Sequence, residues 1–110
     1  MRAMIEWDDI QRYCDAIARE FKPRQIVVFG SYAHGHPTND SDVDVMAVMP
    51  FSKKSGTRPS LAIRRRIAAG FPVDILVREP DDIARRLRRG DSFITDVIKR
   101  GKLMYEAEHA

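Results

Sequence analysis

The sequence is poor in cysteine and has no long apolar run. Its 110 residues include a single cysteine, Cys14, so an internal disulfide and a cysteine-rich zinc site are both excluded. No apolar stretch approaches the roughly 18–20 residues that a membrane span needs. Acidic residues stand near the N-terminus, where a signal peptide would be apolar. These absences predict a cytoplasmic protein with no membrane-spanning segment.

What the sequence does contain is the composition of one globular domain. Hydrophobic residues make up 44% and charged residues 32% of the chain, a balance typical of folded rather than disordered proteins. Independent domains commonly run to about 100–150 residues, and no linker or internal repeat divides this chain. We therefore expect a single domain over residues 1–110.

The charge is divided unevenly. Residues 1–50 carry 5 basic and 8 acidic groups, whereas residues 51–110 carry 14 and 8. Such asymmetry is typical of a surface that meets phosphates, nucleic acid or an acidic partner, although arginine-rich helices also have solvated outer faces. Nucleic-acid sites usually place aromatic residues among the basic ones. No aromatic residue lies within the arginine clusters at 64–66 and 85–89, so we do not expect nucleic-acid binding.

Hydrophobic spacing predicts helices and strands along the whole chain. Apolar residues spaced by three and four predict an amphipathic helix from Trp7 to Phe21, and short β-branched runs predict strands. Helices are expected at 7–21, 60–69, 81–89 and from Phe93 to a C-cap at Gly101, and strands at 25–29, 42–48 and 72–77, with residues 102–105 as a small terminal strand. Residues 50–59 are expected to form a loop.

This order of elements predicts an α/β or α+β fold, a small sheet with helices on at least one face. In the helix at residues 60–69, Leu61, Ile63 and Ile67 are expected to point inward and the three arginines outward. The pattern leaves the pairing of the strands open.

Three carboxylates fall within the predicted strands. Asp42 and Asp44 share one face because strand side chains alternate, and Asp74 lies in the next strand. If the two strands pair, Asp74 joins the other two, and the repulsion among them would be relieved by a hard cation such as Mg²⁺. The alternative is that Asp42 caps the preceding turn while Asp44 and Asp74 lie on a solvated face.

Gly30 and Ser31 directly follow the first predicted strand. A Gly-Ser pair at a strand-to-helix junction presents backbone N–H groups and a hydroxyl to an anion. Alone it is a weak signal, but ten residues later the chain reads Asp42-x-Asp44. The combination places a phosphate-binding turn beside a metal-binding pair, as Mg²⁺-assisted phosphoryl transfer requires.

Taken together, these motifs resemble those of the minimal nucleotidyltransferases of the DNA polymerase β superfamily. The resemblance rests on FGSYAHG at residues 29–35, SDVDV at 41–45 and VDI at 73–75, and it extends to the ending GKLMYE at 101–106. It implies the polymerase-β-like fold, a small mixed sheet flanked by helices. It also implies two Mg²⁺ ions and a nucleoside triphosphate substrate, which we expect to be ATP.

The resemblance assigns roles to five residues. Asp42, Asp44 and Asp74 match the catalytic and metal-binding carboxylates. Gly30 and Ser31, together with Asp42 and Asp44, match the nucleotide-binding residues. Asp74 can also accept the proton of a hydroxyl that attacks the α-phosphorus while pyrophosphate leaves.

Two residues of the FGSYAHG segment leave alternatives open. Many relatives have arginine where this chain has His34. If that arginine contacts phosphate, His34 weakens nucleotide binding or makes it dependent on pH; if it serves only structure, little changes. Tyr32 either flanks the nucleotide or packs beneath the turn.

The acceptor is implied only by the resemblance. Larger relatives add a second domain that selects the acceptor, which we do not expect within these 110 residues. Stand-alone relatives often pair with a HEPN-type ribonuclease toxin and act as antitoxins that transfer AMP to a tyrosine of the toxin. One alternative is transfer to a small molecule, with a homo-oligomer completing the site. Another is a catalytically silent antitoxin that acts by binding alone.

Overall fold

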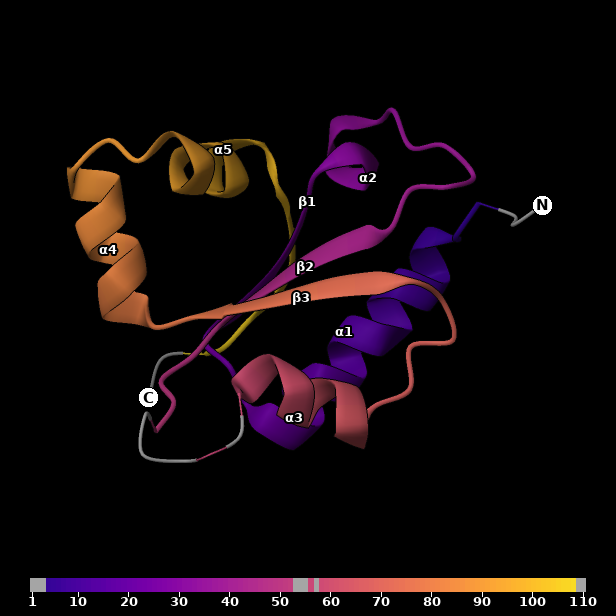
Figure 1. The fold of residues 1–110 in the computed structure, drawn as a ribbon, viewed down its shortest axis with the longest axis horizontal. Coiled ribbons are helices and arrows are strands. Elements are labelled where there is room, and N and C mark those ends of the chain that lie inside the picture. Colours follow the sequence, from indigo (N-terminus) through magenta and orange to yellow (C-terminus); the bar gives the residue numbers. More distant parts are fainter. Residues whose placement is uncertain (1–3, 53–55, 57, 109–110) are drawn as a thin grey trace.

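A mixed four-stranded sheet forms the middle layer of the computed structural model, which describes residues 4–52, 56 and 58–108 (Figure 1). Its strands are β1 (Gln25–Phe29), β2 (Val43–Val48), β3 (Val73–Arg78) and β4 (Lys102–Glu106), in the order β3-β2-β1-β4. Strand β1 is antiparallel to β2 and β4, and β2 is parallel to β3. The small mixed sheet implied by the family resemblance is thereby confirmed, and the strand pairing that the residue pattern left open is settled.

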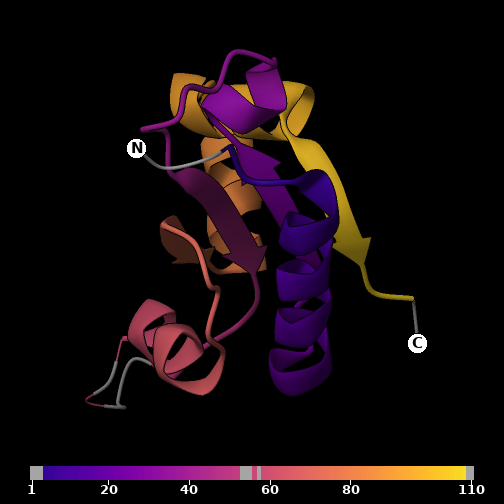
Figure 2. The same cartoon turned by 90° about the vertical axis from the view of Figure 1, so that its right-hand side faces the viewer.

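Helices α1 (Trp7–Phe21) and α3 (Pro59–Arg66) cover one face of the sheet (Figure 1). Their buried residues, including Ile10, Ile17 and Ile63, pack against the residues of β1, β2 and β3 that point to this side. We call this the α1/α3 core. The single thiol, Cys14, is fully buried within it, and burial raises the pKa of that thiol to about 12. Helix α1 also runs beside the edge strand β4 (Figure 2).

Helices α4 (Pro80–Arg88) and α5 (Ser92–Arg100) cover the other face. Here Ile83, Ile94 and Val97 meet the opposite set of strand residues, in what we call the α4/α5 core, whose other members are Val27, Met46 and Val48. Because side chains alternate along a strand, β2 and β3 send their even-numbered residues to this face. Asp44 and Asp74 therefore lie on the α4/α5 side of the sheet.

Three details of the helices differ from the prediction. A four-residue helix, α2 (Ser31–His34), follows β1 directly and was not expected as a separate element. Helix α3 ends at Arg66 because Ile67 is extended. The expectation that Leu61 points inward was wrong, since it is 38% exposed. Leu61 and Ile63 are two positions apart, which places them on opposite sides of a helix, and Ile63 takes the buried side.

Gly101, at the end of α5, is required for close packing and not for a left-handed backbone. Gly101 is the C-cap as expected, but its φ of −71° is not left-handed. A Cβ at this position would overlap the Val97 carbonyl oxygen and lie 2.6 Å from a methyl group of Val27. The glycine is therefore needed for the close approach of the chain to β1.

The loop expected at residues 50–59 falls partly on residues 53–55 and 57, which lie outside the described part of the chain, and Pro59 already begins α3. Within the described residues, no helix has both the length and the apolar character required to cross a membrane.

Candidate active site

The three carboxylates singled out in the sequence gather at one end of the sheet. Asp44 and Asp74 are directly opposite one another in the register of the parallel strands β2 and β3. Partners in adjacent strands lie about 5 Å apart at the backbone. Asp42 immediately precedes β2 and is two residues from Asp44, so the alternation of the strand brings it to the same side. The two parallel strands begin at this end, and the antiparallel β1 ends here.

Asp44 lies at the electrostatic centre of this group. Burial raises the pKa of Asp44 above its usual value, and the negative charges of Asp74 and Asp42 raise it further. Each of the two other carboxylates is therefore close enough for Asp44 to sense its charge. Crowding of this kind is relieved by a bound cation or by a proton.

Gly30 brings the turn after β1 against the central carboxylate. Its neighbour Phe29 is the register partner of Asp44, so the chain leaves β1 directly beside that side chain. Gly30 has φ 73° and ψ −152°, a conformation that is essentially restricted to glycine. A Cβ at this position would overlap Oδ2 of Asp44 and lie 3.2 Å from its Cγ. Glycine is thus required here both by its backbone conformation and by the contact.

Ser31 begins the short helix α2 next to this contact, and the helix is closed by Gly35 at φ 82°. The neighbouring Tyr32 is 5% exposed and belongs to the α1/α3 core. Its ring packs edge-on against Trp7, and its hydroxyl accepts a hydrogen bond from the backbone N–H of Ile5 at 3.1 Å. Of the two alternatives for Tyr32, the structure supports packing beneath the turn.

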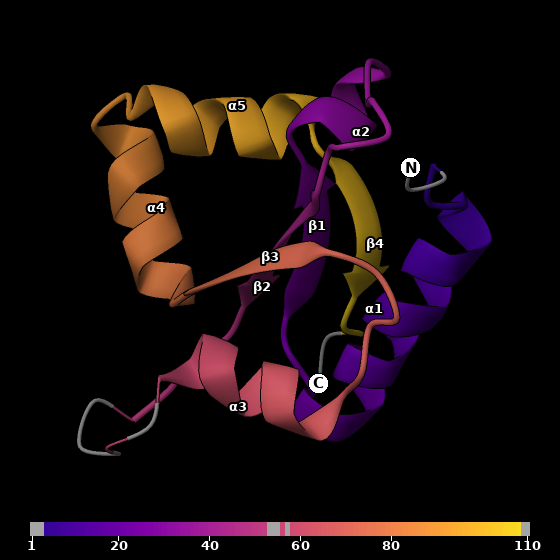
Figure 3. The same cartoon turned by 45° about the vertical axis from the view of Figure 1, so that its right-hand side comes forward.

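His34 has an acidic partner on another helix. Its Nε2 lies 3.3 Å from Oδ2 of Asp96, and Asp96 also pairs with Arg100 at 3.4 Å. Helices α2 and α5 lie side by side at this end of the molecule, so the pair joins the turn after β1 to α5 (Figure 3). The structure thus gives His34 a role in holding α2 against α5.

Asp74 also has a basic partner. Nη2 of Arg64 lies 3.8 Å from Oδ1 of Asp74, and the same nitrogen donates a hydrogen bond to the carbonyl of Val73 at 2.7 Å. The sequence pattern had placed Arg64 on the outer face of its helix and had given Asp96 no role. In the sequence, nothing distinguishes Arg64 from the two arginines that follow it. The contact of Arg64 with Asp74 and that of His34 with Asp96 each join segments that only the fold brings together.

The donor set suits a hard cation, but its side chains do not converge. Carboxylate oxygens are the ligands that Mg²⁺ prefers in proteins, and the crowding at Asp44 is of the kind that a cation relieves. As the side chains stand, no group of three or more His, Cys, Asp or Glu residues within 4–52, 56 and 58–108 is arranged to hold a metal ion. Asp74 is turned toward Arg64 instead.

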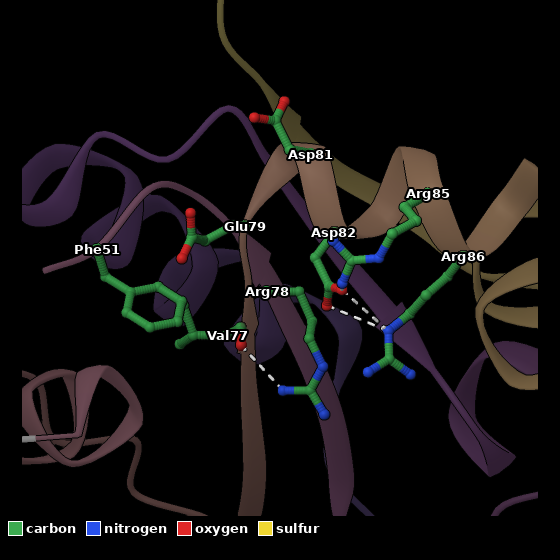
Figure 4. Close-up of a pocket in the computed structure, with 8 residues that line it drawn as sticks. All are labelled: Phe51, Val77, Arg78, Glu79, Asp81, Asp82, Arg85 and Arg86. Atoms are coloured by element: carbon green, nitrogen blue, oxygen red, sulfur yellow. Dashed lines mark hydrogen bonds and ion pairs between the residues drawn. The ribbon is translucent and has the colours of Figure 1, made fainter. Parts of the chain in front are cut away.

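A separate hollow of about 350 Å³ lies at the other end of β3 (Figure 4). It contains both acidic and basic groups, and its lining residues are Phe51, Val77, Arg78, Glu79, Asp81, Asp82, Arg85 and Arg86. Asp82 pairs with both Arg85 and Arg86, and Arg78 donates to the Val77 carbonyl at 2.9 Å. Because Asp82, Arg85 and Arg86 pair among themselves and the hollow lies at the opposite end of β3 from Asp74, we assign the hollow no part in the chemistry.

Comparison with known proteins identifies the fold. Residues 10–103, most of the chain, match the family described as nucleotidyltransferase domain. The chain belongs to this family. The fold class inferred from the sequence motifs is thereby confirmed for this nucleotidyltransferase domain, and the matched region contains every carboxylate discussed above.

Two solved structures resemble this nucleotidyltransferase domain. A Sulfolobus solfataricus protein assigned as a nucleotidyltransferase has a TM-score of 0.62 and 21% sequence identity, covering 94% of this chain and 82% of its own. A chain of a toxin–antitoxin structure with AMP-PNP has a TM-score of 0.57 and 21% identity, covering 89% and 74%. At this level of identity the likeness establishes the fold. A search among curated proteins finds no significant match.

Proposed function

We propose that this nucleotidyltransferase domain is an antitoxin that transfers AMP from ATP, in a Mg²⁺-dependent reaction, to a tyrosine hydroxyl of a HEPN-type ribonuclease toxin. One observation supports the proposed chemistry. At one end of the sheet, Asp44 is the register partner of Asp74 and also lies against Gly30. Membership of the nucleotidyltransferase family supports the reaction type.

The residues have distinct tasks in this proposal. Asp42 and Asp44 would hold Mg²⁺, and Asp74 would complete the set. The chemistry that bound Mg²⁺ supplies here is neutralisation of phosphate charge and activation of the attacking hydroxyl. The turn at Gly30 and Ser31 would hold the phosphates through backbone N–H groups and the serine hydroxyl.

The reaction exchanges one bond to phosphorus for another. The acceptor oxygen forms a bond to the α-phosphorus, and the bond from that phosphorus to the pyrophosphate oxygen breaks. Asp74 accepts the proton of the attacking hydroxyl. Its 66% exposed side chain is suited to this task because an acceptor from a partner can reach it without the domain opening.

The toxin partner rests on different support. The fold resembles that of a chain in a toxin–antitoxin structure that contains an ATP analogue. The basic C-terminal half provides charge for an acidic partner surface, with exposed arginines on both α3 and α4. The identity of the toxin as a HEPN ribonuclease follows from the resemblance to stand-alone relatives.

Two experiments test the proposal in sequence. Calorimetric titration of ATP with Mg²⁺ is expected to show metal-dependent binding by the wild type that is lost in Asp42→Asn/Asp44→Asn. The matched control is Glu106→Gln/Glu108→Gln, which removes two negative charges at the opposite end of the sheet. Transfer of label from α-labelled ATP to a co-expressed HEPN ribonuclease is then expected with the wild type and the control variant only. Absence of labelled toxin under conditions where ATP binds would overturn the proposed acceptor.

One observation favours the alternative of an antitoxin that acts by binding alone. Among the described residues, the three carboxylates do not converge into a metal site as they stand. An Asp44→Ala protein separates the two functions. If it still neutralises the toxin as well as the wild type does, contact rather than transfer is the mechanism.

A further inference from the structure

Arg64 reaches around the open edge of the sheet to Asp74. Helix α3, which carries Arg64, lies on the α1/α3 face, where Ile63 is buried. Asp74 is on the opposite face of β3, and β3 is an edge strand. The guanidinium of Arg64 spans this edge. Its Nη2 donates a hydrogen bond to the Val73 carbonyl oxygen at 2.7 Å and lies 3.8 Å from Oδ1 of Asp74. No interior position of the sheet would allow such a contact between the two faces.

This contact gives Asp74 a positively charged partner other than a cation shared with Asp44. Asp44 and Asp74 are register partners, and Asp44 senses the charge of Asp74. Their backbones are therefore close enough for a shared cation. Yet within the described residues no set of three such ligands is formed, and Asp74 has Arg64 as a basic partner. A guanidinium beside Asp74 supplies positive charge without the octahedral geometry that Mg²⁺ imposes.

We propose that Arg64 is a positioning residue that competes with the divalent cation for Asp74, so that Asp74 must leave Arg64 for the three-carboxylate site to form. This inference rests on the proposed function, since it assumes that the carboxylates bind metal. The ion pair is suited to exchange because Arg64 is 45% and Asp74 66% exposed, and exposed pairs contribute little to stability. The anchor on Val73 keeps the guanidinium near the site when the pair separates.

The test is the affinity for Mn²⁺ alone, measured without nucleotide from the electron paramagnetic resonance signal of free Mn²⁺. We compare Arg64→Gln with Arg65→Gln, which removes the same charge from the next position of the same helix. Competition predicts that Arg64→Gln binds Mn²⁺ about two- to fivefold more tightly than Arg65→Gln, the scale of one exposed ion pair. Arg64→Lys retains the charge and is expected to stay close to the wild type.

A second comparison shows whether the effect passes through Asp74. In an Asp74→Asn background, the difference between Arg64→Gln and Arg65→Gln is expected to vanish. A difference that persists there would mean that Arg64 acts by long-range charge and would overturn the inference. Circular dichroism and thermal unfolding establish that each variant folds, and Arg64→Met, which also removes the charge, replaces Arg64→Gln if that variant does not fold.

The outcomes separate this inference from the proposed function. If the wild type binds Mn²⁺ and Arg64→Gln binds no more tightly than Arg65→Gln, the competition is refuted while the metal site stands. If neither the wild type nor Arg64→Gln binds Mn²⁺, both proposals fail. Tighter binding by Arg64→Gln that depends on Asp74 supports both.

Discussion

The backbone of Gly30 lies against the carboxylate of Asp44, with no room for a side chain between them. Gly30 directly follows β1 and Asp44 is the second residue of β2, so the contact joins the turn after one strand to the centre of the acidic group. In the proposed function, this contact would place the phosphates held by the turn next to the cation held by Asp44.

Replacement of Gly30 by alanine should be severely destabilising. The new Cβ would overlap Oδ2 of Asp44, and the backbone would be held in a conformation that alanine avoids. We expect the free energy of unfolding to fall by about 3 kcal/mol, as measured by urea denaturation. Gly35→Ala is the matched control, because Gly35 has φ 82° but a Cβ there would meet nothing within 4 Å. Equal losses in the two variants would show that the contact with Asp44 contributes nothing.

The ionisation of Asp44 should oppose folding. Because the folded-state pKa of this carboxyl is raised above its usual 3.8, the folded chain holds its proton more tightly than the unfolded chain. The stabilisation from this group is therefore present at acid pH and is lost as the pH rises from 3.8 through the raised value. In chelator-treated buffer, Asp44→Asn should raise the Tm by a few degrees at pH 7, and the gain should shrink toward pH 3.5. A lower Tm than the wild type at pH 7 would contradict this.

The pair of His34 and Asp96 should contribute a measurable coupling. A double-mutant cycle with His34→Ala and Asp96→Ala is expected to give about 0.2–1 kcal/mol at pH 5.5. His36→Ala, which removes an exposed imidazole two residues away, should show no coupling to Asp96. A coupling between His34 and Asp96 that is indistinguishable from zero would show that the contact does not hold α2 against α5.

Removal of the hydroxyl group should have opposite effects on stability at Tyr13 and at Tyr32. The hydroxyl of Tyr13 is buried and has no hydrogen-bond partner among the described residues, and burial raises the pKa of Tyr13 to about 12. Tyr13→Phe should therefore stabilise the fold by about 1 kcal/mol, because an unsatisfied buried polar group is removed. Tyr32→Phe should destabilise it by a similar amount, since the Ile5 N–H loses its acceptor. Equal destabilisation of the two variants in chemical denaturation would refute the first expectation.

Local patterns in the sequence were sufficient for most of the elements. The three- and four-residue spacing from Trp7 to Phe21 predicted α1, and the β-branched runs predicted β1 to β3, because these patterns follow directly from the periodicities of helix and strand. Helix α2 was not predicted because a segment of four residues is too short to show a helical period. Leu61 was wrongly predicted to point inward because the prediction used its hydrophobicity and ignored its angular position around the helix relative to Ile63.

The sequence by itself determined the chemistry that is available: a glycine-serine turn, three aspartates in or beside strands, and a match to the nucleotidyltransferase pattern. The tertiary structure decided which of these groups meet. The parallel pairing of β2 with β3 sets Asp44 opposite Asp74, and the sheet edge lets Arg64 reach Asp74 from the other face. These contacts join residues 10 to 62 positions apart, including His34 with Asp96. Local propensity does not predict such pairs, because strand order and helix packing depend on burial of entire apolar faces of the helices and the sheet.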